Sequence, residues 1–145
     1  MSHGKEGVAG SRWCYNRAEI MVDISKVVAL WQTGAREDWD VAADLVERGR
    51  VRHGLFFAHL ALEKSLKAHV CRHTGELAPH THDLVRLAGA AGLPLDNRRR
   101  DVLARMNAHA LAGRYPDALG ATVTPDAARD RLAGAREVFE WLMTW

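Results

Sequence analysis

The stretch GLFFAHLALE, residues 54–63, constrains the fold of this chain more than any other part of the sequence. Its apolar side chains surround the helix axis instead of keeping to one face. A helix of that kind is stable only when other elements cover it on nearly every side. The sequence therefore predicts a central, buried helix over residues 50–73, ended by Gly75.

Helical periodicity of apolar residues runs through the rest of the chain, and the alternation typical of strands is missing. We expect an all-α, up-and-down bundle of four long helices plus one short helix over residues 21–145, as a single domain after a disordered arm at residues 1–20. Besides the central helix, the expected elements are a helix over residues 23–47, a short helix capped by Thr81, a helix from Asp96 or Asn97 to Gly113, and a helix opened by Thr124, Pro125 and Asp126.

Charge and composition exclude several classes of protein. The 145 residues carry a net charge of +2, which alone does not indicate nucleic-acid binding. No apolar run approaches the ~18 residues that span a bilayer, and the first residues lack the apolar core of a secretory signal. Two cysteines make no disulfide framework. We therefore expect a cytoplasmic protein that does not contact a membrane.

Two arginine clusters, at residues 48–52 and 98–100, leave two interpretations open. Arginine forks bind phosphates, so the clusters could contact a polyanion. They are also compatible with solvated helix ends that contribute little to stability, and this is the interpretation we favour.

A row of polar residues follows one face of the central helix. His59, Glu63 and Lys67 stand four residues apart and therefore line one helix face. Because their neighbours are apolar, these side chains must face solvent, a cleft or a partner. An exposed stripe with a Glu63–Lys67 pair and a cleft both remain open.

Histidines 69, 73, 80 and 82 supply the ligand type that zinc prefers, but their spacing fits no closed zinc pattern and no HExxH motif. We expect no metal, with His69 and His73 on the helix surface and His82 in the first turn of the next helix. P-loop, GxSxG and GxGxxG motifs are missing as well, so we expect no cofactor.

The expected loop over residues 113–124 begins with Arg114-Tyr115-Pro116-Asp117. One interpretation is a proline turn in which Asp117 caps backbone amides and Arg114 caps helix carbonyls. The other is a phosphate or base clamp, in which Arg114 grips phosphate, Tyr115 stacks and Asp117 holds Arg114 or a ribose. Long loops in compact domains are often functional.

Three stretches, in this order, resemble the HEPN family, whose members are small helical bundles often encoded beside minimal nucleotidyltransferases. They are WDVAADLVERGR, GLFFAHLALEKSLKAHV, and HTHDLVRLAGAAGL followed by NAHALAGRYPD, and the resemblance spans roughly residues 25 to 142.

The resemblance implies a homodimer that binds a nucleotide or RNA in a cleft between protomers. It also implies a separate nucleotidyltransferase partner, as in a toxin–antitoxin pair, for which Tyr115 or Tyr15 would be the only tyrosine acceptors. The binding residues it implies are Arg114, Tyr115, Asp117, Lys67, Glu63 and His82, with His109 and Asn107 at the edge.

Many family members are metal-independent endoribonucleases with an Arg-x(4–6)-His motif, and this sequence departs from it. No histidine follows Arg114 at that distance, and Arg105 precedes His109 by one residue too few. A ribonuclease toxin with His109 as acid or base and Arg114 as the cation remains one alternative. A non-catalytic protein-interaction module is the other.

Overall fold

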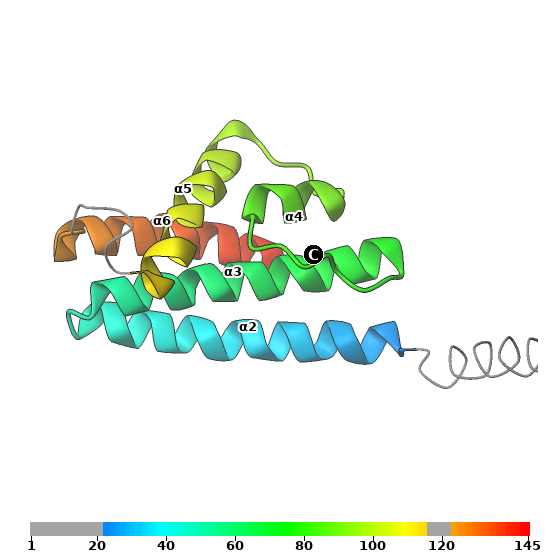
Figure 1. Cartoon of the computed structure of the whole chain (residues 1–145). Coiled ribbons are helices and arrows are strands. Elements are labelled where there is room, and N and C mark those ends of the chain that lie inside the picture. Colours follow the sequence, from blue (N-terminus) through cyan, green and yellow to red (C-terminus); the bar gives the residue numbers. More distant parts are fainter. Residues whose placement is uncertain (1–21, 116–122) are drawn as a thin grey trace, which may run out of the picture.

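The computed structural model describes residues 22–115 and 123–145, and all regular structure in these two segments is helical (Figure 1). The expected N-terminal arm, Tyr15 and Asp117 lie outside the described residues. The bundle of four long helices and one short helix is confirmed. Its elements are α2 (Ile24–Glu47), α3 (Val51–Thr74), α4 (Leu84–Ala90), α5 (Asn97–Arg114) and α6 (Pro125–Met143).

Helix α3 forms the centre of the bundle, as predicted, and contacts each of the other four helices. Leu55, Leu62 and Leu66 on this helix are fully buried. α2 runs antiparallel beside it (Figure 1). The two helices approach closely at Gly54, where a Cβ atom would lie 2.5 Å from Cγ2 of Val46. Any side chain at that position would therefore push α2 away from α3.

Helix α6 runs in the same direction as α3, so that the C-terminal ends of the two helices meet (Figure 1). A ring nitrogen of His69, Nε2, lies 2.8 Å from the carbonyl oxygen of Leu142 at that end. His69 is buried, and its predicted place on the helix surface is wrong because α6 covers this side of α3. His73, one turn further, is exposed as predicted.

Helix α5 crosses α3, and the short helix α4 contacts both α3 and α5 (Figure 1). The α4 N-cap is Asp83, whose Oδ1 accepts hydrogen bonds from the amides of Val85 and Arg86. The prediction of Thr81 as the cap is therefore wrong; its hydroxyl accepts from the Asp83 amide instead. Asp83 is the cap because Asn107 of α5 also donates to the Asp83 carboxylate and holds this carboxylate at the start of α4.

Helix α5 continues to Arg114, so the predicted end at Gly113 is one residue short. Within the two described segments, no helix is both long and apolar enough to cross a membrane.

Candidate functional site

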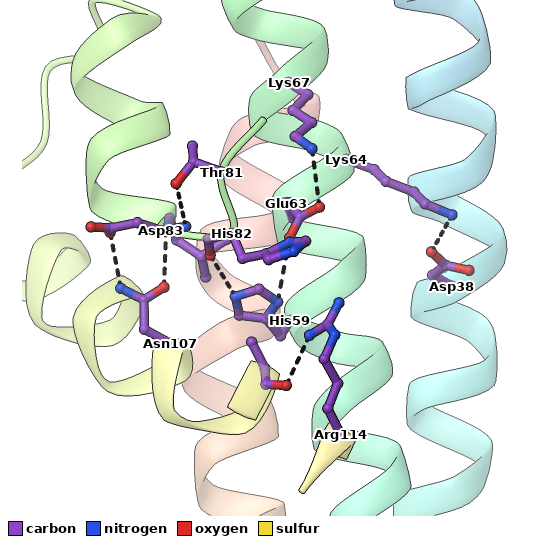
Figure 2. A network of polar contacts seen from close by, with 12 residues as sticks. Asp38, His59, Glu63, Lys64, Lys67, Thr81, His82, Asp83, Asn107 and Arg114 are labelled. Atoms are coloured by element: carbon purple, nitrogen blue, oxygen red, sulfur yellow. Dashed lines mark hydrogen bonds and ion pairs between the residues drawn. The ribbon is translucent and has the colours of Figure 1, made fainter. Parts of the chain in front are cut away.

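The polar row predicted on α3 is covered by other parts of the molecule. His59 is 1%, Glu63 5% and Lys67 8% exposed, so they do not form an exposed stripe. The segment between α3 and α4 returns along α3 and places His82 beside them (Figure 2). We call His59, Glu63, Lys67 and His82 the Glu63 cluster.

The Glu63 carboxylate lies between two basic groups (Figure 2). Its Oε1 is 2.8 Å from Nδ1 of His82, and its Oε2 accepts a hydrogen bond from the Lys67 ammonium at 3.2 Å. The Lys67 ammonium also lies 5.3 Å from the centre of the Trp31 ring. Each carboxylate oxygen therefore has its own partner, as a buried carboxylate requires.

His82 differs from the rest of the cluster because its side chain is 59% exposed. It lies just before the Asp83 cap, and not in the first turn of α4 as predicted. With Nδ1 directed at Glu63, the ring nitrogen left for other contacts is Nε2. The structure thus presents an imidazole at the surface that a buried carboxylate holds in place.

His59 fixes the backbone of the same residue. Its Nε2 donates to the carbonyl oxygen of His82 at 2.9 Å, which places the proton of a neutral ring on that nitrogen. Burial lowers the pKa of the His59 imidazole, against the opposing effect of the Glu63 charge. A neutral His59 and a charged Glu63 therefore hold His82 by its backbone and by its side chain.

Arg114 ends α5 near the same face of α3. Its guanidinium donates to the carbonyl of Ala110 at 2.8 Å and lies 4.9 Å from the centre of the Phe56 ring. Phe56 precedes Glu63 by two helical turns, or about 10 Å along the axis. The helix-capping contact matches the turn interpretation of this segment, while Tyr115, the next residue, is 61% exposed.

His109 is buried, and Arg131 of α6 contacts it. Nε2 of His109 lies 3.1 Å from an Arg131 nitrogen, and because a guanidinium can only donate, the imidazole is the acceptor. Burial and the Arg131 charge lower the pKa of His109 to about 4. A role for Nε2 in catalysis would require this hydrogen bond to break.

Asn107 connects two helices. Its side-chain oxygen accepts from the Leu84 amide at 2.9 Å, and its nitrogen donates to the Asp83 carboxylate at 3.0 Å. The residue is therefore a support for the segment that carries His82.

A groove of about 440 Å³ between α2 and α3 adjoins the Glu63 cluster, because Lys67 belongs to both. Trp31, Leu30, Leu77 and His80 form much of its wall. The sequence interpretation missed Trp31 and Phe56 as neighbours of the site. Phe56 precedes His59 by three residues on the same helix, a spacing that could have indicated it, whereas Trp31 lies on another helix, α2.

Several other sequence candidates are not brought together. In the described segments, no group of three or more His, Cys, Asp or Glu side chains could hold a metal ion. In the second arginine cluster, Arg98 pairs with Glu137, and Arg99 pairs with Asp96 and stacks on Trp141. Two of these three arginines are thus engaged within the chain, which supports the interpretation as a helix end.

Comparison with known proteins gives one family and two solved structures. The family model described as the HEPN domain matches residues 28–145. The fold is similar to TT1696 from Thermus thermophilus, with 22% identity, a TM-score of 0.69, and coverage of 81% of this chain and 96% of that one. It is also similar to ST0689, an archaeal HEPN homologue, with 17% identity, a TM-score of 0.64, and coverage of 81% and 95%. No curated protein matches the sequence.

Proposed function

Because the chain belongs to the HEPN family, we propose that it binds a nucleotide or RNA on the face of α3 that presents Lys67, beside Arg114 of α5 and His82 of the segment before α4. The observation that carries this proposal is the exposed His82 imidazole, which the buried Glu63 carboxylate holds at 2.8 Å. Phosphates bind arginine, lysine and protonated histidine through charge-assisted hydrogen bonds.

The arrangement of the basic groups suits an extended ligand. Arg114 lies over Phe56, and His82 and Lys67 meet at Glu63, about 10 Å further along α3. Basic side chains that three different segments bring to one face can contact different parts of one nucleotide, or successive nucleotides of one RNA. The exposed ring of Tyr115 adds a surface on which a base can stack.

Family membership also supports the homodimer and the nucleotidyltransferase partner as parts of the proposal. The exposed apolar residues Leu30 and Leu77 beside the groove are compatible with a protein contact. Light scattering on the purified chain tests the dimer, with an expected mass of twice 16.1 kDa. If the chain is a monomer at all concentrations, the homodimer is contradicted and the binding site must be formed by one protomer.

Binding is tested with a fluorescently labelled RNA oligonucleotide and, separately, with ATP and GTP. We expect Arg114→Gln to weaken binding by about tenfold, because it removes a charge-assisted contact. The matched control is Arg100→Gln, an exposed arginine of the same helix that lies about 21 Å from Arg114 along the axis. The control should bind like the unchanged protein.

Salt dependence sharpens the test, because phosphate contacts release counterions and weaken as salt increases. Arg114→Gln should reduce the slope of affinity against salt concentration, whereas Arg100→Gln should not. No binding to RNA or nucleotide, or equal losses in the two variants, would contradict the proposal.

A further inference from the structure

Two exposed leucines lie at the groove between α2 and α3. Leu30 of α2 is 73% exposed, and Leu77 of the segment after α3 is 58% exposed. Apolar side chains that gather around a hollow at the surface indicate a binding site. We infer that the groove binds a carboxylic acid with an alkyl chain, whose carboxylate contacts Lys64 and Lys67.

The size and the wall of the groove suit a small molecule with an apolar body. Its volume of about 440 Å³ is in the range that small-molecule sites usually have. The apolar wall combines residues of α2 with residues of the segment after α3, namely Val27, Leu30, Trp31, Leu77 and Ala78. An alkyl chain can therefore leave water on two sides at once when it enters the groove.

The charged side chains of the groove have one sign. Among the described residues that line it, the titratable side chains are Lys64, Lys67 and His80, and none is acidic. A ligand with an acidic head is therefore complementary in charge. A nucleobase fits less well, because its polar edges need hydrogen-bond partners that the valine and leucine side chains of the wall do not offer.

Both lysine ammonium groups are held by carboxylates that do not line the groove. The Lys67 ammonium donates to Glu63 at 3.2 Å, and the Lys64 ammonium lies 2.7 Å from Oδ2 of Asp38 (Figure 2). Because an ammonium has three N–H donors, each lysine keeps donors for a ligand after this contact. The two ion pairs thus fix the positions of the cations and leave charge-assisted hydrogen bonds available.

Gly34 of α2 leaves the space in which Lys64 lies. A Cβ atom at Gly34 would be 3.2 Å from Cδ of Lys64, which is closer than ordinary van der Waals contact. The stem of Lys64 therefore passes directly over the backbone of α2, at a position that also lines the groove. A glycine inside a helix lowers its helix propensity, and here it keeps the groove open.

The test uses octanoate as the probe and follows the backbone amide signals of the ¹⁵N-labelled protein by NMR. We expect the signals of Gly34 and Ala78 to shift with octanoate, and that of Gly134 on α6 to stay unchanged. Acetate has the head without the chain, and 1-octanol has the chain without the charge. Each should bind at least about tenfold more weakly than octanoate.

Leu77→Asp and Leu111→Asp form a matched pair of variants. Both change an exposed leucine, and Leu111 of α5 does not line the groove. Leu77→Asp places a negative charge on the apolar wall, so octanoate should bind about tenfold or more weakly. Leu111→Asp should bind octanoate like the unchanged protein.

The acidic head is tested by the double variant Asp38→Asn with Lys64→Gln. It removes both charges together, so that neither is left without its partner. Octanoate should bind several-fold more weakly to this variant, whereas 1-octanol should bind as it does to the unchanged protein. Equal changes for the two compounds would mean that Lys64 only supports the fold, and would contradict its assigned contact.

The inference is independent of the proposed nucleotide or RNA binding, because Arg114 and His82 do not line the groove. It is overturned if octanoate causes no shift, if octanoate and 1-octanol bind equally, or if the two aspartate variants lose affinity equally. Shifts of Gly34 and Ala78 on dilution without ligand would mean that a second copy of the chain covers the groove, which overturns it too. If AMP shifts these signals and octanoate does not, the groove belongs to the nucleotide site and the inference fails while the proposed function stands.

Discussion

The Glu63 cluster and the His109–Arg131 pair both lie beside α3, and both contain an imidazole and a basic side chain. In the cluster, a carboxylate stands between Lys67 and His82, and the last group of the network reaches the surface. In the pair, His109 contacts Arg131 directly with no carboxylate between them, and the imidazole stays inside.

The difference shows what decides the role of a histidine in this molecule. Next to Arg131, only the neutral form of His109 is stable, so its acceptor nitrogen is used to hold α5 to α6. His82 faces the Glu63 carboxylate on one side and solvent on the other, so its Nε2 stays available for contacts outside the chain. Substitutions in the two regions and on the surface test this difference.

The largest effect is expected from Glu63→Ala. This change leaves the Lys67 ammonium buried without its carboxylate, and we expect the free energy of unfolding to fall by about 3 kcal/mol. Urea unfolding followed by circular dichroism measures it. The double variant Glu63→Leu with Lys67→Met should recover much of the loss, because neither charge is then buried alone. A loss below about 0.5 kcal/mol, the range of exposed pairs, would mean that the cluster is solvated.

The next effect is the pH dependence of His109. Its folded-state pKa of about 4 lies below the ordinary value of 6.5, so between these values the unfolded chain binds a proton that the folded chain does not. Stability from the neutral ring is therefore complete above pH 6.5 and falls as the pH drops towards 4. We expect a loss of about 2 kcal/mol from this group, less than full linkage gives, since solvent reduces the shift.

His109→Gln isolates that contribution, because the amide oxygen can still accept from Arg131 but does not titrate. The free energy of unfolding should depend less on pH in this variant than in His73→Gln, which changes an exposed histidine. Burial lowers the pKa of His59 and His69 too, so part of the dependence will remain. Identical pH profiles for the two variants would show that His109 is not held neutral.

A smaller effect is expected from Asn107→Ala, which removes the acceptor of the Leu84 amide and a donor to Asp83. We expect a loss of about 1 kcal/mol in unfolding free energy and weaker RNA binding, since the segment before α4 carries His82. Arg105→Ala, an exposed change on the same helix, is the control for both measurements. Unchanged binding together with lost stability would separate the support of α4 from the position of His82.

The smallest effect should come from Arg98→Ala. The Arg98–Glu137 pair is exposed on both sides, and such pairs contribute at most about 0.5 kcal/mol. Thermal unfolding of this variant gives the change in unfolding free energy for an exposed ion pair. The changes caused by the substitutions in the two buried regions are compared with that value. A loss as large as that of Glu63→Ala would remove the distinction.

The sequence predicts the helices of this fold well because their signals are local. Gly75 ends α3 in the left-handed conformation at φ 71°, and Thr124 and Pro125 begin α6 as expected. The spacing of His59, Glu63 and Lys67 also indicates correctly that they share one face of α3. These features depend on residues within a few positions of one another.

What the sequence does not predict depends on contacts between distant segments. Only the family resemblance groups His82 with Glu63, 19 positions earlier; the residues near His82 do not indicate their contact, and nothing near His109 indicates Arg131. Thr81 and Asp83 are both good caps, and the choice between them depends on Asn107 of another helix. His69 looks like a surface residue until α6 covers it.

The parallel packing of α6 on α3 also bears on the order in which the chain folds. α2 and α3 are neighbours in sequence and can pair as soon as both exist, whereas the bond from His69 to Leu142 closes a separation of 73 residues. Closing such a loop costs entropy before any contact offsets it, and distant contacts slow folding. We therefore expect docking of α6 to be the late, rate-limiting event, with one side of α3 open to solvent until it occurs.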